Sequence, residues 1–384
     1  MKFETLRLKP GKEKALGRRH PWIFSGALTR IPDHLKDGQL VQVLDNQGQF
    51  QASGFFRPGS IAVLVVSFLD TPDFGKYIEE QLTKAIAYRE KLGLLTSAHT
   101  NCYRLVYGEG DQLPGLIIDR YAETAVIQTH HPGWLPFLEV ISNHLLKQVK
   151  YVFHRPADKV SGVESSWLTA RPELYEVLEN GHRFKIDLEE GQKTGFFLDQ
   201  RENRKKLAEY ASGKTVLNTF SYSGGFSVYA LAAGARKVVS VDISESAIEL
   251  ARVNVQLNGF DERHEAVSSD VLQFLKTEGG SFDIIILDPP AFSKSRRTIH
   301  KAVQAYKRLN AKAISEIKTG GLLFSFSCSQ HMSPQLFEDT LRAAAIETGR
   351  PVRIVERLGQ PADHPTNIYH PEGTYLKGLI LEVT

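Results

Sequence analysis

The sequence predicts an α/β protein whose C-terminal half is a doubly wound, mostly parallel sheet. From about Gly191 onward, short apolar runs alternate with helical segments. The run at 284–287 is continuously apolar, as strands buried on both faces of a sheet are. Small residues follow the first run and acidic residues follow later ones. These are the positions at which doubly wound sheets bind their ligands.

Two smaller domains are expected before this sheet. The N-terminal segment carries β-rich runs at 40–44 and 61–68 and lacks helical periodicity. A linking helix is expected near 71–95, and strands and a helix near 135–148 then indicate a compact α+β unit. The predicted domains are therefore 1–72, 73–185 and 186–384.

The last domain is predicted to combine parallel strands with a closing hairpin. The expected parallel strands are 215–220, 237–241, 264–267, 283–287 and 322–326. Two further β-runs are joined without a helix, so they should pair antiparallel; they are 352–358 and 375–383. A Rossmann-like seven-stranded sheet that ends in such a hairpin is typical of class I methyltransferases and not of dinucleotide dehydrogenases.

Composition limits the classes of function. The net charge of +3 does not by itself indicate a nucleic-acid partner, but residues 1–30 hold eight basic and two acidic residues. This excess suits either a phosphate-contacting module or a solvated basic face. Two distant cysteines, Cys102 and Cys328, exclude a disulfide framework and a four-cysteine zinc site, and no metal is expected. The sequence shows no signal peptide or membrane span, so we expect a soluble, cytoplasmic protein.

A turn of small residues follows the first parallel strand and indicates a cofactor site. Such a turn lets the backbone approach a ligand closely, and its departure from G-x-G-x-x-G argues against a dinucleotide. The residues expected at the cofactor here are Asn218, Phe220, Ser221, Ser223, Gly224 and Gly225.

Acidic residues at the ends of the next two strands complete this site. Asp242, followed by Ile243, ends the second strand, where a carboxylate can accept both ribose hydroxyls. Asp270 follows the third strand and is either a partner for an adenine amino group or only a helix N-cap. The cofactor predicted from this arrangement is S-adenosyl-L-methionine.

The ends of the fourth and fifth parallel strands carry groups suited to catalysis. Asp288 is followed by two prolines, which stop strand pairing, and Cys328 follows the fifth strand. Neighbouring strands would bring both side chains into one pocket. A thiolate that adds to carbon-6 of a pyrimidine activates carbon-5 toward methylation, and the carboxyl group of Asp288 would brace the ring. The other interpretation makes Cys328 a small buried hydrophobe, which we also expect for Cys102.

A basic segment follows the fourth strand. Residues 293–312 contain seven Lys or Arg and no acidic residue. They suit a phosphate-bearing substrate, or form a solvated helix face. Phe292, just before them, either stacks on a flipped base or belongs to the core.

Several segments together carry a family resemblance. They are His20–Ala27, Tyr107–Leu116, Lys193–Arg201, Asp363–Pro365 and Tyr375–Lys377. With the strand-end residues, they resemble the bacterial large-subunit ribosomal RNA (cytosine-5)-methyltransferases that carry an N-terminal PUA domain, over nearly the whole chain.

The resemblance implies roles for particular residues. Cys328 would be the nucleophile and Asp288 its partner, and the segment that contains Thr194 and Gln200 would close over the cofactor. The first domain would be a PUA domain that binds RNA. Two positions bear on the family pattern: Asn218 stands where the family usually has Asp, and Ala291 stands where another group of RNA cytosine-5 enzymes has a cysteine.

The predicted function is the formation of 5-methylcytosine in 23S ribosomal RNA. Two alternatives remain open: an exocyclic-amine methyltransferase of RNA or DNA, which would use Asp-Pro-Pro without a cysteine, and a non-catalytic RNA-binding or ribosome-assembly factor. A small-molecule methyltransferase would leave the first 185 residues without a purpose. The sequence does not decide whether the chain forms a homodimer.

Overall fold

The described residues form two compact units, and the chain passes from one unit to the other several times. The computed structural model describes residues 3–70, 73–157, 160, 162–173, 175–293 and 296–384. Unit 1 consists of Met1–Tyr175, Asp187–Gly195 and Ala362–Gly373. Unit 2 consists of Glu176–Ile186, Phe196–Pro361 and Thr374–Thr384. Lys2 and Lys294 of the two basic segments, and the start of the expected linking helix at 71–72, lie outside the described residues.

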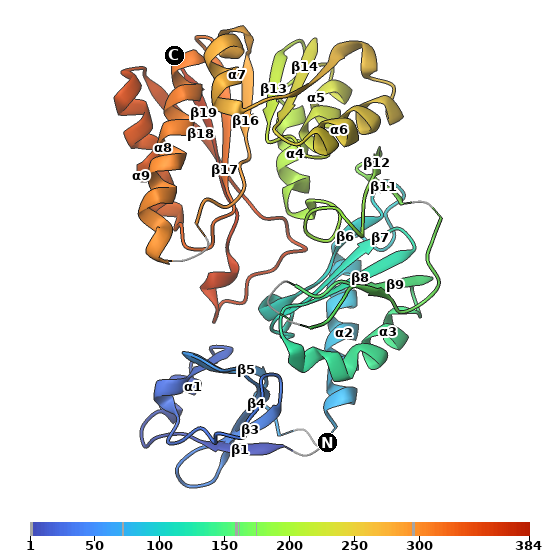
Figure 1. The fold of residues 1–384 in the computed structure, drawn as a ribbon, viewed down its shortest axis with the longest axis vertical. Helices are drawn as coiled ribbons and strands as arrows, with labels where there is room; N and C mark the ends of the chain where they lie inside the picture. The colour runs from blue at the N-terminus through green and yellow to red at the C-terminus, as the bar shows by residue number, and fades with distance from the viewer. Residues whose placement is uncertain (1–2, 71–72, 158–159, 161, 174, 294–295) are drawn as a thin grey trace. The chain divides into compact units, whose positions relative to one another are not determined.

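The N-terminal part of unit 1 is a five-stranded sheet in the order β1-β3-β4-β5-β2 (Figure 1). Its strands are β1 (Glu4–Arg7), β2 (Trp22–Phe24), β3 (Leu40–Leu44), β4 (Phe50–Phe56) and β5 (Ile61–Ser67). Buried aliphatic side chains such as Leu8, Val43 and Val63 form its core. The predicted β-rich character is confirmed. The sheet also carries the helix α1 (Glu13–Leu16), which is too short to produce the periodicity by which a sequence reveals a helix.

The second part of unit 1 is another five-stranded sheet, in the order β10-β9-β8-β7-β6, with two helices. The linking helix α2 begins after Asp73, whose side chain accepts a hydrogen bond from the Lys76 amide. The helix expected near 135–148 begins later than expected, because Pro132 and Pro136 fall within a 3₁₀ segment before it. The elements are α2 (Phe74–Lys91), β6 (Cys102–Tyr107), β7 (Leu116–Tyr121), β8 (Thr124–Thr129), α3 (Leu138–Leu145), β9 (Tyr151–His154) and β10 (Ser166–Trp167).

Unit 2 is built on a seven-stranded sheet in the order β15-β14-β13-β16-β17-β19-β18. The first five strands in this order are parallel, and β19 runs antiparallel to both β17 and β18. The predicted parallel sheet with a closing hairpin is thus confirmed. Its strands are β13 (Thr215–Thr219), β14 (Lys237–Asp242), β15 (His264–Ser268), β16 (Ile284–Leu287), β17 (Gly321–Ser327), β18 (Val352–Gly359) and β19 (Lys377–Val383); a separate hairpin pairs β11 (Glu176–Glu179) with β12 (His182–Lys185).

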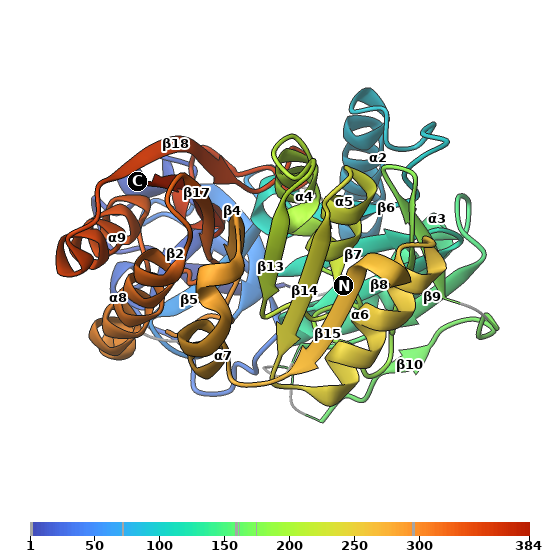
Figure 2. The same ribbon diagram turned by 90° about the horizontal axis from the view of Figure 1, so that it is seen from above.

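Helices cover both faces of the seven-stranded sheet (Figure 2). Leu217, Ile285 and Leu323 pack in the core that also contains side chains of α7, α8 and α9. Strand side chains alternate between faces, and Phe326 contacts Phe226 of α5 on the opposite face. The helices are α4 (Arg201–Ala208), α5 (Gly225–Ala232), α6 (Glu245–Leu257), α7 (Val271–Glu278), α8 (Ile299–Glu316) and α9 (Pro334–Thr348). Within the described ranges, no helix combines the length and the apolar character that a membrane span requires.

Candidate active site

The turn between β13 and α5 is tight and partly strained. Phe220 and Tyr222 have φ values of 53° and 44°, a region that non-glycine residues rarely adopt, and Gly224 has a φ of 74°. A Cβ atom on Gly224 would lie 3.0 Å from Ala251, and one on Gly225 would lie 2.9 Å from Arg204. Both glycines are therefore required by close packing, as the small-residue pattern predicts.

The end of β14 is tied to this turn through Asp242. One carboxylate oxygen of Asp242 accepts the Tyr222 amide at 3.1 Å, and the other accepts the Ser244 amide at 3.0 Å. The adjacent Ile243 is 75% exposed, which is unusual for a large aliphatic side chain. The hydroxyl of Ser221 is buried and has no hydrogen-bond partner among the described residues. The structure thus brings together Ser221, Ser223, Gly224, Gly225, Asp242 and Ile243 at one edge of the sheet.

Four other residues expected at the cofactor make contacts within the fold. Asn218 is 1% exposed and its amide donates to the Ser227 hydroxyl at 2.9 Å, which holds α5 on the sheet. Gln200 is buried and accepts from Asn203 at 2.5 Å. Exposed Asp270 caps α7 by accepting the Gln273 amide at 3.0 Å, the alternative that the sequence left open. Thr194 belongs to unit 1, where its hydroxyl donates to Asp119 at 2.5 Å.

The ends of β16 and β17 lie side by side, as predicted. Leu287 pairs with Ser325, so the residues that follow these two strands are neighbours. The Cys328 Sγ atom lies 4.0 Å from the carbonyl oxygen of Pro289, the residue after Asp288. Cys328 and Asp288 are both partly buried, whereas Cys102 in unit 1 is fully buried, as expected for a structural cysteine.

Tyr306 of α8 lies beneath these strand ends. Burial of its hydroxyl raises the pKa of Tyr306 to about 12, and the nearby Cys328 and Asp288 add to this rise. The ring of Phe292 packs 4.7 Å from the Tyr306 ring and against the core of the sheet. Phe292 therefore has the core position that was one of its two interpretations.

Lys377 is a residue of this region whose position the sequence did not reveal. It begins β19, opposite Ser327 of β17, and is 5% exposed. Its Nζ atom donates to the carbonyl oxygens of Ser329 at 2.7 Å and Tyr375 at 2.6 Å. Burial lowers the pKa of Lys377 to about 8, and Cys328 acts in the opposite direction. The signal available in the sequence was a lysine at the start of a strand that is otherwise almost wholly apolar.

The basic segment on α8 is partly neutralised. Lys307 pairs with Glu347 at 2.7 Å and Lys312 pairs with Glu316 at 2.5 Å. Among the described members of the segment, three basic residues are exposed: Arg297, Lys301 and Arg308.

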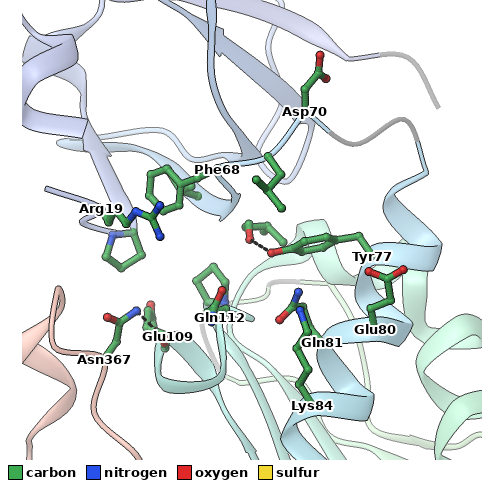
Figure 3. A pocket seen from close by; sticks show the side chains of 15 residues that line it. Arg19, Phe68, Asp70, Tyr77, Glu80, Gln81, Lys84, Glu109, Gln112 and Asn367 are labelled. Carbon is green, nitrogen blue, oxygen red and sulfur yellow. Dashed lines mark hydrogen bonds between the residues drawn. The ribbon is translucent and has the colours of Figure 1, made fainter. Parts of the chain in front are cut away.

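Unit 1 contains a pocket of about 370 Å³ (Figure 3). Its lining mixes the cations Arg19 and Lys84 with the acids Asp70, Glu80 and Glu109, and it includes no residue predicted for the site. The arrangement has no evident chemistry.

A cluster of His20, His370 and Glu372 in unit 1 resembles a metal site by proximity. However, Nδ1 of His20 accepts the Trp22 amide at 3.2 Å, so in neutral imidazole the proton is on Nε2, the atom that faces Glu372. A protonated nitrogen cannot ligate a metal, and the cluster is better described as a close contact between two imidazole rings and a carboxylate.

Comparisons with known proteins show which family the sequence resembles. The sequence profile of the S-adenosylmethionine-dependent methyltransferases matches residues 128–380, and that of a PUA-like domain matches residues 6–68. Ribosomal RNA large subunit methyltransferase I of Alteromonas mediterranea is 38% identical over 392 residues, covering 98% of this chain and 98% of that protein. The protein of the same name from Klebsiella pneumoniae is 37% identical over 404 residues, covering 99% and 98%. A crystal structure described as a methyltransferase complexed with SAH is 24% identical, covers 99% of this chain and 100% of its own, and has a TM-score of 0.86.

Proposed function

We propose that this chain forms 5-methylcytosine in 23S ribosomal RNA. The chain belongs to the S-adenosylmethionine-dependent methyltransferases and, among them, to the family of the ribosomal RNA large subunit methyltransferases I. The observation that carries the cytosine-5 chemistry is the position of Cys328. Its thiol lies beside the Asp288-Pro289-Pro290 turn at the end of an adjacent strand. Among the common methyl acceptors of RNA, a ring carbon is the one that needs a nucleophile of this kind.

The β13–α5 turn and the end of β14 fit the cofactor. Ser221 offers a buried hydroxyl without a partner among the described residues, and Ile243 offers an exposed apolar side chain for the adenine ring. In the proposed arrangement Asp242 accepts the ribose hydroxyls, while the turn lets backbone amides reach the rest of the cofactor. When bound, S-adenosylmethionine supplies an electrophilic methyl group.

The other residues predicted at the cofactor would act on it less directly. Asn218 and Gln200 are buried within unit 2 and would act by shaping the turn and the start of α4. Asp270 would reach the adenine amino group only while it also caps α7. Phe220 supports the turn through its packing on the sheet core. Thr194 belongs to unit 1, and its role at the cofactor is only what the family resemblance implies.

Cys328 and Asp288 would divide the chemistry between them. The thiolate of Cys328 would add to carbon-6. Carbon-5 would then bond to the methyl group as the bond between that group and the sulfonium sulfur breaks. A base takes the carbon-5 proton, the bond between carbon-6 and sulfur breaks, and Cys328 is released. The carboxyl group of Asp288, held at the strand end by two prolines, faces the ring nitrogen at position 3 and stabilises the adduct.

The proposed RNA partner is supported by surface charge and by the N-terminal domain. Arg297 just before α8, and Lys301 and Arg308 in its first and middle turns, are exposed in the segment that follows Asp288. The PUA-like domain has its own basic residues, and we propose that it positions the RNA through phosphate contacts. Comparing the modified nucleotides of 23S ribosomal RNA by mass spectrometry, with and without the gene, identifies the target.

The mechanism is tested by replacing each cysteine in turn. Cys328→Ala should abolish turnover, by more than about 10³-fold, because the covalent route is lost. Binding of S-adenosylmethionine, measured by calorimetry, should persist. The matched control is Cys102→Ala, which removes the fully buried thiol of unit 1 and should leave methylation intact. RNA that carries 5-fluorocytosine at the target should form a stable adduct with the wild-type protein, since fluorine cannot leave as a proton.

The rival reaction gives opposite results. An exocyclic amine would be held by Asp288 and a proline carbonyl and would need no thiol. Turnover that survives in Cys328→Ala, together with no trapped adduct, would therefore replace cytosine-5 methylation with amine methylation. A chain that binds no S-adenosylmethionine would support the non-catalytic RNA-binding alternative.

A further inference from the structure

Lys377 is a buried cation at the strand end that bears Cys328. The side chain of a lysine is almost never this buried unless it is paired with a negative charge. Lys377 is 5% exposed, and its Nζ atom makes two hydrogen bonds, both to backbone carbonyls. No carboxylate lies within ion-pair distance of Nζ in the part of the chain that the structure describes.

One of the two carbonyls connects Lys377 directly to the Cys328 segment. One acceptor, Ser329, is the residue that follows Cys328, and Ser327 on the other side pairs with Lys377 in the ladder between β17 and β19. The lysine therefore lies next to the segment that carries the thiol. A thiolate at Cys328 would be a negative charge that this buried ammonium can compensate.

We propose that Lys377 is a positioning residue that holds a positive charge next to the Cys328 segment and thereby favours the thiolate form of this cysteine. The thiolate preference is a property of the protein alone, whereas its consequence for methylation rests on the proposed function. Two observations fit this role: the hydrogen bond from Nζ to the carbonyl next to Cys328, and the burial of an ammonium group with neutral acceptors only.

Three described groups near Cys328, from other elements, act in the opposite direction or are neutral. Asp288, from the end of β16, disfavours a second negative charge, and the Pro289 carbonyl accepts a hydrogen bond from the protonated thiol. Tyr306, from α8, stays neutral because its pKa is about 12. Lys377 of β19 supplies the compensating charge that a thiolate needs in this setting.

The burial of Lys377 argues against a role as the base that takes the carbon-5 proton. Its Nζ atom is enclosed, and two of its N–H groups are committed to carbonyl oxygens. A base must reach the proton that it removes, directly or through one water. Lys377 therefore acts on the reaction through Cys328 and not on the substrate.

The test is the pH dependence of Cys328 alkylation by iodoacetamide, in the full-length protein without RNA. Peptide mass spectrometry assigns the label to Cys328, so no cysteine has to be replaced. Lys377→Gln removes the charge but keeps an amide donor for the two carbonyls. We expect the pH midpoint of the alkylation rate to rise by about one unit or more, because an opposite charge at close range shifts a titration by that amount.

Two controls separate charge from packing. Lys377→Arg keeps the charge and should keep the midpoint near that of the wild type. Lys318→Gln removes a lysine at the opposite end of the same region, just before β17, where it pairs with Asp283 at 3.0 Å. This variant should leave the alkylation profile unchanged. Circular dichroism and S-adenosylmethionine binding confirm that each variant is folded, and Lys377→Met replaces Lys377→Gln if the latter is not.

The outcomes are distinct. An unchanged alkylation midpoint in a folded, neutral variant at position 377 overturns the inference, whatever the fate of the methylation mechanism. A shifted midpoint together with an active Cys328→Ala protein would instead keep the inference and remove the proposed cytosine-5 chemistry.

Discussion

The two ends of strand β16 carry the same residue type in two different environments. Asp283 precedes the strand and Asp288 follows it. Asp283 accepts hydrogen bonds from the Thr215 amide at 2.8 Å and from its hydroxyl at 2.7 Å, and it pairs with Lys318 at 3.0 Å. Asp288 lies at the opposite end with Cys328 and Tyr306. One carboxylate fastens neighbouring strands, and the other lies near a thiol and a phenolic hydroxyl.

The direction of the strands explains this difference. In a parallel sheet all carboxyl ends meet at one edge, where the following loops can form a site, and all amino ends meet at the other. At the amino end the partners of Asp283 come from β13 and from the residues before β17, and they satisfy its charge inside the fold. Both aspartates are partly buried, so it is their position relative to strand direction that distinguishes them.

Neutralising each aspartate in turn is the strongest test of whether the two ends of β16 have different roles. Asp288→Asn should lower kcat by about 10²-fold or more, because it removes charge that stabilises the transition state. RNA binding, measured by filter retention, should persist. Asp283→Asn is the matched control, an identical change at the other end of the strand, and should retain nearly full activity. Equal losses of activity in both variants would contradict the assignment of different roles to the two ends.

The edge of the sheet that is proposed for the cofactor offers a second comparison. Asp242→Ala should weaken S-adenosylmethionine binding by about 1.5–3 kcal/mol, the scale of hydrogen bonds to a charged group. Isothermal titration calorimetry measures this change. Asp261→Ala, which removes an exposed carboxylate before β15, serves as the control for the loss of charge. If Asp242→Ala binds the cofactor as tightly as the control does, Asp242 only supports the turn through Tyr222.

The sequence predicted the features of unit 2 that depend on local pattern. Apolar runs predicted the strands, and small residues predicted the β13–α5 turn. The hairpin of β18 and β19 was predicted because no helix was expected between these two strands. The adjacency of Asp288 and Cys328 followed from strand order alone. Positive φ at Phe220 and Tyr222 was not predicted, because neither residue favours that conformation.

Features that depend on which side chains face each other could not be predicted in the same way. Asn218 is a polar residue in a strand, and nothing nearby in the sequence shows that it bonds to Ser227 across the strand–helix contact. Lys377 lies 49 positions beyond Cys328, and only the antiparallel pairing of β17 and β19 brings them together. The partners of Asp283 are likewise distant in the chain, because they are Thr215 and Lys318.

The smallest expected effect concerns stability at the amino end of β16. Burial opposes the ionisation of Asp283, but the hydrogen bonds from Thr215 and Lys318 outweigh it and lower the pKa of Asp283 to about 2. Because the pKa of Asp283 is lower in the folded protein than its value near 4 in the unfolded chain, the ionised carboxylate stabilises the fold above about pH 4. This stabilisation is lost as the pH falls from about 4 toward 2. Allowing for partial solvent screening, Asp283→Asn should lower the free energy of unfolding by about 1–2 kcal/mol at pH 7. Calorimetric melting should show a lower Tm for the variant at pH 7, with a difference from wild type that shrinks between pH 4 and pH 2. A difference that stays constant over that range would mean that Asp283 stabilises the sheet through its shape and hydrogen bonds and not through its charge.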